Sequence, residues 1–217
     1  MEIDIAKYID FTLLKPEADS AMFKKLCEDA VKHKFYSVCI PPYMIKECAG
    51  LLEGSGVKIC TVAGFPSGYA DSETKAFEVG AAVKNGADEA DAVINVSALK
   101  SKKTDYIKNE LALLRKAAGT NVLKIIIETC YLTPEEIVEA SKLVSESGAD
   151  FVKTSTGFGP CGARLEDVEL IKKSILPGTK IKASGGIKSY AQALEFINAG
   201  ASRIGASSLL LRQEINK

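Results

Sequence analysis

Two lysines stand at the ends of short apolar runs, where their amino groups could do chemistry. Lys153 ends the run that begins at Phe151, and Lys182 follows Ile181. A lysine in a buried strand is costly unless its ammonium group has a partner or a task. Two ammonium groups crowded together in a partly dry pocket favour the neutral, nucleophilic form of one of them. The pair therefore predicts an enzyme that forms a Schiff base with a carbonyl compound.

A change in pKa decides whether this chemistry is possible at neutral pH. The pKa of a lysine must fall from about 10.4 toward 7 before the amine can attack a carbonyl, which corresponds to roughly 4 kcal/mol. A second ammonium nearby in a partly dry pocket can supply this. The structural alternative is that one lysine extends to solvent while the other pairs with Asp91. The residues alone leave both interpretations open.

Asp91 lies in an otherwise apolar run that ends at Asn95. Its carboxylate needs a partner if the run is a buried strand, and a lysine is the natural candidate. A carboxylate beside a lysine can also move protons to and from the substrate of a Schiff-base enzyme, directly or through water. A purely structural ion pair explains Asp91 equally well at this level.

Turns of small residues follow two late apolar runs. Gly185 and Gly186 come shortly after Lys182. Ser207 and Ser208 come after the last run. Backbone approaches a phosphate most easily where side chains are absent, and a helix that starts there presents free N–H groups. We therefore predict a phosphate site built from both turns.

Eight short apolar runs carry these residues, and amphipathic stretches separate them. The spacing of about 20 to 35 residues suits a repeated βα unit. The runs are Tyr8–Asp10, Ser37–Ile40, Lys58–Ala63, Glu89–Ile94, Leu123–Ile127, Phe151–Lys153, Lys180–Ala183 and Arg203–Gly205. Alternating strands and helices need a parallel sheet, so this α/β pattern predicts a single (β/α)8 TIM barrel over residues 1–217. A doubly wound open sheet is the alternative.

Closure of a barrel would bring distant residues together, because everything just past the strand ends faces one mouth. The residues that this rule gathers are Asp91, Asn95, Glu128, Lys153, Thr154 and Lys182. The loops after the last two strands hold phosphate in many such barrels. The lysine pair and the phosphate turns are therefore expected at the same mouth.

The composition excludes several classes of function. Lys and Arg together number 28, as do Asp and Glu, so there is no basic field for nucleic acid or for a membrane surface. The expected partner is a small molecule. Six cysteines without a C-x-x-C pair, a start without signal-peptide character and no apolar stretch of roughly 20 residues predict a cytoplasmic chain with reduced thiols.

The other candidate residues are weaker. His33, the single histidine, lies in a helical stretch and is expected at the surface. Without a second histidine, a metal-dependent aldolase or a histidine-based hydrolase is disfavoured, and no metal or cofactor is expected. Cys39 ends the second run and is expected in the core. Lys15 and the lysines of 100–103 are expected to be solvated loop charges.

Five strings in the same order resemble the deoxyribose-phosphate aldolase family. They are IDFTLLKP at 9–16, VAGFP at 62–66, DEADAVIN at 88–95, FVKTSTGF at 151–158 and KIKASGGI at 180–187. The resemblance spans nearly the whole chain. It implies a metal-free class I aldolase on a (β/α)8 barrel, which interconverts 2-deoxy-D-ribose 5-phosphate with D-glyceraldehyde 3-phosphate and acetaldehyde in deoxyribonucleoside catabolism.

The resemblance also implies roles for individual residues. Lys153 would form the Schiff base, Lys182 would favour its neutral form and join the proton relay, and Asp91 would act as general acid and base. Thr12 and Thr154 would contact the sugar hydroxyls. The phosphate site that the resemblance implies comprises Gly157, Gly185, Gly186, Ser207 and Ser208.

The sequence departs from the family pattern at three positions and at its end. Phe11 stands where the family usually has histidine, Ser67 where it has leucine and Ser97 where it has glycine; we expect effects on packing more than on chemistry. Many relatives end in a tail with a tyrosine that assists proton transfer, but no tyrosine follows Tyr190. We therefore expect slow proton transfer, or a relay through the aspartate, the second lysine and water.

Other functions stay open. One alternative is a different barrel enzyme of phosphorylated small molecules, either a class I aldolase with another acceptor or a phosphosugar isomerase that forms no Schiff base, and borohydride trapping on Lys153 separates these two. The second alternative is a catalytically silent barrel that binds phosphosugars without turnover. The exposed helices of a barrel would also allow a homo-oligomer.

Overall fold

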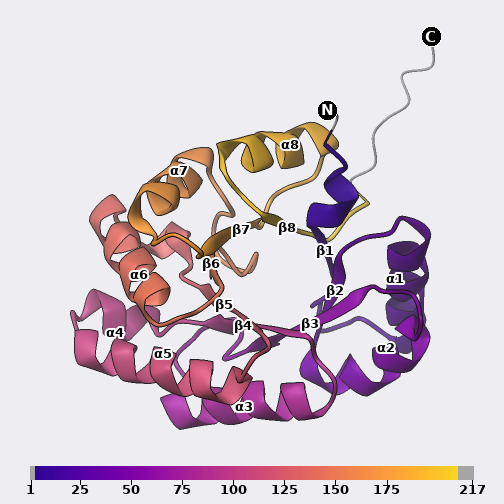
Figure 1. Cartoon of the computed structure of the whole chain (residues 1–217), viewed down its shortest axis with the longest axis horizontal. Helices are drawn as coiled ribbons and strands as arrows, with labels where there is room; N and C mark the ends of the chain where they lie inside the picture. Colours follow the sequence, from indigo (N-terminus) through magenta and orange to yellow (C-terminus); the bar gives the residue numbers. More distant parts are fainter. Residues whose placement is uncertain (1–2, 210–217) are drawn as a thin grey trace.

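The computed structural model describes residues 3–209. Within that range, parallel strands close into a barrel in the order β1 to β8, with helices around it (Figure 1). The strands are β1 (Ile9–Thr12), β2 (Ser37–Ile40), β3 (Lys58–Ala63), β4 (Glu89–Val93), β5 (Val122–Ile126), β6 (Phe151–Lys153), β7 (Lys180–Ser184) and β8 (Arg203–Ala206). The predicted (β/α)8 barrel is confirmed. The open sheet is excluded because β1 pairs with β8 through Ile9 and Ile204.

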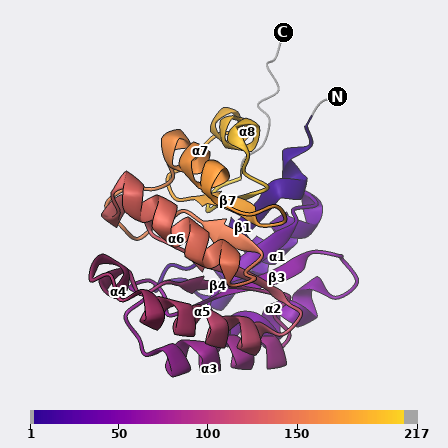
Figure 2. The same ribbon diagram turned by 60° about the vertical axis from the view of Figure 1, so that its left-hand side comes forward.

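Helices cover the outside of the barrel, as Figure 2 shows from a second direction. The α-helices are α1 (Ser20–Lys32), α2 (Ile45–Leu52), α3 (Ser72–Lys84), α4 (Val96–Lys100), α5 (Thr104–Ala118), α6 (Pro134–Glu146), α7 (Leu165–Ser174) and α8 (Tyr190–Ala199), and the 3-10 helices of the described part are η1 (Ile5–Tyr8), η2 (Pro42–Met44) and η3 (Thr129–Tyr131). In residues 3–209, no helix has the length and apolar character needed to cross a membrane.

The strands agree with the predicted runs to within one residue at each end, except at the end of the first strand. That strand, predicted at Tyr8–Asp10, continues to Thr12. It does so because Thr12 still pairs with Cys39 of β2. The prediction that one domain spans residues 1–217 includes residues outside the described range and stays a prediction.

Side chains alternate between the two faces of each strand, so the protein has two buried regions, one inside the barrel and one between the barrel and the helices. Val152 and Ile181 belong to the apolar core between barrel and helices. Lys153 and Lys182 are their neighbours in sequence, and both reach into the barrel, where they contact Asp91. Successive side chains of a strand point to opposite faces, so each strand supplies both the outer core and the polar interior.

A buried ion pair outside the barrel connects two mouth loops to the helix layer. Lys75 of α3 and Glu110 of α5 are fully buried and paired. Lys75 Nζ also donates to the carbonyls of Gly68 (2.8 Å) and Val93 (3.0 Å), and Glu110 accepts from the N–H of Asn95 (3.0 Å). Burial lowers the pKa of Lys75 and raises the pKa of Glu110, although each ion opposes the shift of the other. The pair holds the loops after β3 and β4.

Glu110→Ala is expected to lower the free energy of unfolding by about 3–5 kcal/mol, because it leaves the Lys75 ammonium buried without its counter-charge. Urea denaturation followed by circular dichroism measures this loss. The double variant Lys75→Met/Glu110→Leu removes both charges and is expected to recover most of the stability. A double variant as unstable as Glu110→Ala would show that the ion pair is not the source of the loss.

Candidate active site

The interior of the barrel holds charged side chains in place of the branched aliphatic residues that usually fill such barrels. We call this group the charge cluster. Its members are Asp10, Glu89, Asp91, Lys124, Lys153, Lys182 and Arg203. All of them come from strands and are buried. Because burial removes their hydration, each charge must be compensated by its neighbours.

Asp91 of β4 is the centre of the charge cluster. Its Oδ2 atom accepts from Lys153 Nζ (2.7 Å) and Lys182 Nζ (2.8 Å). Its Oδ1 atom accepts from Lys124 Nζ (2.8 Å) and from the thiol of Cys60 (3.1 Å). Strand register produces this arrangement, because Lys153 lies opposite Lys182 and Asp91 lies opposite Lys124. The predicted lysine pair shares one carboxylate oxygen, and neither lysine extends to solvent.

The buried charges are paired with opposite charges more completely near the amino ends of the strands. Arg203 Nη1 lies 2.7 Å from a carboxylate oxygen of Asp10 and 2.9 Å from one of Glu89. Lys182 also pairs with Asp10 (2.5 Å), and Lys124 also pairs with Glu89 (2.5 Å). Each of these cations therefore bridges at least two carboxylates.

The ion pairs keep these groups charged despite their burial. Burial acts to raise the pKa of Asp91, but Lys124, Lys153 and Lys182 hold that pKa well below its usual value. Burial acts in the same direction on Asp10, and Lys182 and its neighbours outweigh it, so the pKa of Asp10 is lowered. Burial acts to lower the pKa of Lys182, but the Asp10 and Asp91 carboxylates raise it. At neutral pH, Asp91 is therefore a carboxylate and Lys182 an ammonium.

Sequence reasoning missed several members of the cluster. Lys124 interrupts the apolar run Leu123–Ile127, so the signal that singled out Lys153 was present there too. Asp10 ends the predicted run Tyr8–Asp10 as Lys153 ends its own, so that signal was present there as well, whereas Glu89 and Arg203 begin their runs and carry no comparable signal. Only the register and closure of the barrel show that the side chains of Asp10, Glu89 and Arg203 meet.

A cavity of about 510 Å³ opens beside Lys153 at the carboxyl ends of the strands. The predicted site residues in its walls are Thr12, Lys153, Gly157, Gly185, Gly186 and Ser207. Thr154 is buried behind the wall, where its hydroxyl donates to the carbonyl of Ser184 (3.3 Å). Ser208 is exposed beyond the last strand and outside the lining. The structure thus brings the lysine and the turns of small residues to one cavity.

Two glycines present bare backbone to this cavity. Gly185 and Gly186 have left-handed φ values of 86° and 77°. A Cβ atom on Gly185 would lie 2.9 Å from the Cα atom of Gly162, which is too close for any other residue. A Cβ atom on Gly186 would meet open space. A phosphate can approach such backbone closely.

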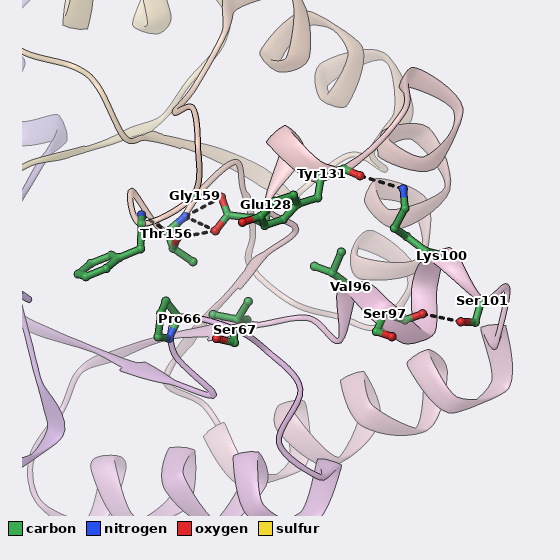
Figure 3. Close-up of a pocket in the computed structure, with 12 residues that line it drawn as sticks. Pro66, Ser67, Val96, Ser97, Lys100, Ser101, Glu128, Tyr131, Thr156 and Gly159 are labelled. Carbon is green, nitrogen blue, oxygen red and sulfur yellow. Dashed lines mark hydrogen bonds between the residues drawn. The ribbon is translucent and has the colours of Figure 1, made fainter.

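A second cavity, of about 570 Å³, adjoins the first and shares Thr156 and Phe158 with it. Figure 3 shows the Glu128 carboxylate in its wall, where it accepts from the backbone N–H (3.2 Å) and the hydroxyl of Thr156. Glu128 is buried and has a left-handed φ of 51°, a costly conformation for a residue other than glycine. The contact holds the segment that follows Lys153.

The departures from the family pattern fall outside the lysine site. Phe11 is buried against Phe35, with ring centroids 5.3 Å apart, so it contributes to packing. Ser67 and Ser97 line the second cavity. The chain end after residue 209, which bears on the missing tyrosine, lies outside the described residues.

Predictions for three surface residues need correction. Lys100 borders the second cavity and donates to the carbonyl of Tyr131 (2.9 Å; Figure 3), so it is not simply a solvated loop charge. Lys15, also expected to be a solvated loop charge, is exposed but borders the first cavity. His33 caps the end of α1 and is half-buried rather than fully at the surface, because its ring stacks on that of Phe35 (5.7 Å).

Within residues 3–209, two sets of side chains could be considered for a metal ion. The potential ligand atoms of Cys39, Cys60 and Asp91 lie within 4.8 Å of one another, as do those of Asp10, Cys60 and Glu89. The carboxylates in both sets already accept from lysine or arginine. A bound cation would lie beside these positive groups, which repel it. While the lysines are protonated, the residues present do not fit a metal ion.

The fold and the site together define a class, the (β/α)8-barrel enzymes with a buried lysine at the mouth. Comparison with known proteins gives the family within that class. The family model of the DeoC/LacD family aldolases matches residues 5–212, and the chain belongs to this family.

Individual relatives agree with this assignment. The deoxyribose-phosphate aldolase of Brevibacillus brevis is 52% identical over 206 residues, which cover 95% of this chain and 93% of the relative. The structure of QR15, an aldolase, has a TM-score of 0.91 and 43% identity over 95% of this chain and 93% of its own. A deoxyribose phosphate aldolase from Aeropyrum pernix, described as having a unique tetrameric structure, has a TM-score of 0.85 and 32% identity over 94% and 87% of the two chains.

Acid is expected to destabilise the protein through Asp10 and Asp91. Their pKa values in the folded protein lie below the ordinary value of 3.8, so the native state binds fewer protons than the unfolded state in acid. Their contribution to stability is nearly complete above about pH 5 and is lost progressively as the pH falls further. Urea denaturation from neutral pH down to about pH 3 measures this slope. Asp10→Asn is expected to lose stability less steeply in acid; an unchanged slope would contradict the assignment.

Proposed function

We propose that the protein is a class I deoxyribose-phosphate aldolase, which reversibly cleaves 2-deoxy-D-ribose 5-phosphate to D-glyceraldehyde 3-phosphate and acetaldehyde. The observation that carries the proposal is the position of Lys153, whose amino group pairs with Asp91 and which borders the same cavity as Gly185 and Gly186. One cavity thus offers an amine for the aldehyde end of the substrate and bare backbone for its phosphate end. The names of the relatives support this choice of substrate.

The proposed reaction begins at C1, the aldehyde carbon of the open-chain sugar. Lys153 Nζ adds to C1 and water leaves, which gives an iminium ion. A base takes the proton of the C3 hydroxyl, the C2–C3 bond breaks, and its electron pair moves toward the iminium nitrogen to give an enamine. D-glyceraldehyde 3-phosphate leaves with its new carbonyl at the former C3. Protonation of C2 and hydrolysis then release acetaldehyde and free Lys153.

Asp91 and Lys182 suit the proton transfers of this reaction. Asp91 is ionised, so it can accept the hydroxyl proton, directly or through water, and return a proton to C2. Lys182 stays cationic, and its positive charge favours the neutral amine of Lys153. Thr12 borders the cavity, so it is better placed than Thr154 to contact a sugar hydroxyl.

The remaining expectations concern the phosphate and the setting of the reaction. We place the phosphate at Gly157, Gly185, Gly186 and Ser207, which line the cavity at the ends of β6, β7 and β8. Ser208 follows directly and is exposed. We also propose a cytoplasmic homo-oligomer that acts in deoxyribonucleoside catabolism; the tetrameric relative supports the oligomer.

Sodium borohydride in the presence of 2-deoxyribose 5-phosphate is expected to leave a reduced adduct on Lys153, because hydride converts the iminium ion to a stable secondary amine. Peptide mass spectrometry locates the adduct. Lys153→Leu is the control and should carry none. Binding of the phosphosugar without an adduct would favour the isomerase or the silent binding barrel.

Ser207→Asp is expected to raise KM for 2-deoxyribose 5-phosphate about tenfold, the equivalent of ~1.4 kcal/mol, because its carboxylate would repel the phosphate. Steady-state kinetics with the phosphorylated and the unphosphorylated sugar measure the effect, and the unphosphorylated sugar should be far less affected. Ser207→Ala is the matched uncharged control. An equal loss with both sugars would place the phosphate elsewhere.

A further inference from the structure

The charge cluster carries more positive than negative side chains. Within residues 3–209, its cations are Lys124, Lys153, Lys182 and Arg203, and its anions are Asp10, Glu89 and Asp91. When every lysine is protonated, the cluster has a surplus of one positive charge. A buried surplus is costly, and loss of one proton from a lysine relieves it.

Among the described residues, Lys153 forms the fewest ion pairs of the three lysines in the charge cluster. Among the described carboxylates it pairs with Asp91 alone, whereas Lys124 and Lys182 each pair with further carboxylates. Lys153 also borders the cavity, so its proton has a path to solvent. Lys153 is therefore the lysine of the cluster whose proton could leave with the loss of the fewest ion pairs.

Lys124 creates the surplus without bordering the cavity. Its side chain has 0% exposure and lies outside the cavity lining. Its Nζ atom is 2.8 Å from Asp91 and 2.5 Å from Glu89. Lys124 thus compensates the same carboxylate that would otherwise hold Lys153 as an ammonium. Without it, three cations would face three anions, and Lys153 would be needed as the third cation.

We propose that Lys124 is a positioning residue whose buried charge leaves Lys153 free to react as a neutral amine at neutral pH. It acts through Asp91 and does not touch the substrate. The inference rests on the proposed function, because it concerns the lysine that would form the Schiff base.

Other titratable groups face these lysines from the neighbouring strands. Cys60 of β3 lies 3.3 Å from Lys124 Nζ, and burial raises the pKa of its thiol. The pKa of the Cys39 thiol of β2 is lowered by its hydrogen bond with Cys60, and the charges of Lys182 and Lys153 act in the same direction. Lys182 faces Lys153 from β7. The variants below leave both thiols and Lys182 in place, so the contribution of these groups is common to the whole series.

A charge series tests the proposal. Lys124→Met removes the surplus, Glu89→Gln enlarges it, and the double variant restores a surplus of one without Lys124. The readout is the pH at which adduct formation on Lys153, with acetaldehyde and cyanoborohydride, reaches half of its maximal rate. We expect this pH to rise by roughly one to three units in Lys124→Met, to fall in Glu89→Gln and to return toward the wild-type value in the double variant.

A merely structural role for Lys124 would give a different pattern. The rate would fall at every pH with an unchanged midpoint, and the double variant would not restore the profile; either result would overturn the proposal. Should Lys124→Met fail to fold by circular dichroism, Glu89→Gln decides alone, since an unchanged midpoint there contradicts the surplus. Absence of an adduct in the wild type would instead overturn the proposed function.

Discussion

The sharing of Asp91 by lysines from three strands of the described barrel is the interaction on which the site depends. Burial makes each ion costly, and only close opposite charges offset this cost. Members of such a network depend on one another, so the cluster acts as a unit rather than as separate pairs. It also demands one strand register, because a shift by one residue would turn Lys124 or Lys182 into the apolar layer.

The number of carboxylates that pair with each buried cation changes along the barrel axis. Near the amino ends of the strands, Arg203 bridges Asp10 and Glu89. Near the carboxyl ends, Lys153 pairs with a single carboxylate of residues 3–209, Asp91, and shares it with other lysines. The deep part therefore stabilises the arrangement, and the part beside the cavity is where the proposed reaction would take place. A reaction is expected where buried charges are incompletely paired and a substrate can enter.

Local sequence signals predicted part of this arrangement. Short apolar runs revealed the strands, and Lys153 and Asp91 stood out because they interrupt or end such runs. The contact between Asp10 and Lys182 joins residues 172 positions apart and exists only because the barrel closes. The sequence also did not show which way a side chain points just after a strand ends. Thr154, for example, turns its hydroxyl to the carbonyl of Ser184 rather than to the cavity. Such features depend on register and closure, which no local pattern encodes.

The surplus of positive charge also bears on the steps that would follow attack by Lys153 in the proposed reaction. Once Lys153 becomes an iminium ion in the proposed reaction, the cluster regains its surplus. In the proposed reaction, cleavage of the C2–C3 bond moves an electron pair toward the nitrogen and gives a neutral enamine, while the proton of the C3 hydroxyl passes to Asp91. The positive surplus therefore moves from the nitrogen of Lys153 to the neighbouring carboxyl group, and it returns to the nitrogen when Asp91 protonates C2. The bond can thus break and C2 can be protonated without a change in the total buried charge.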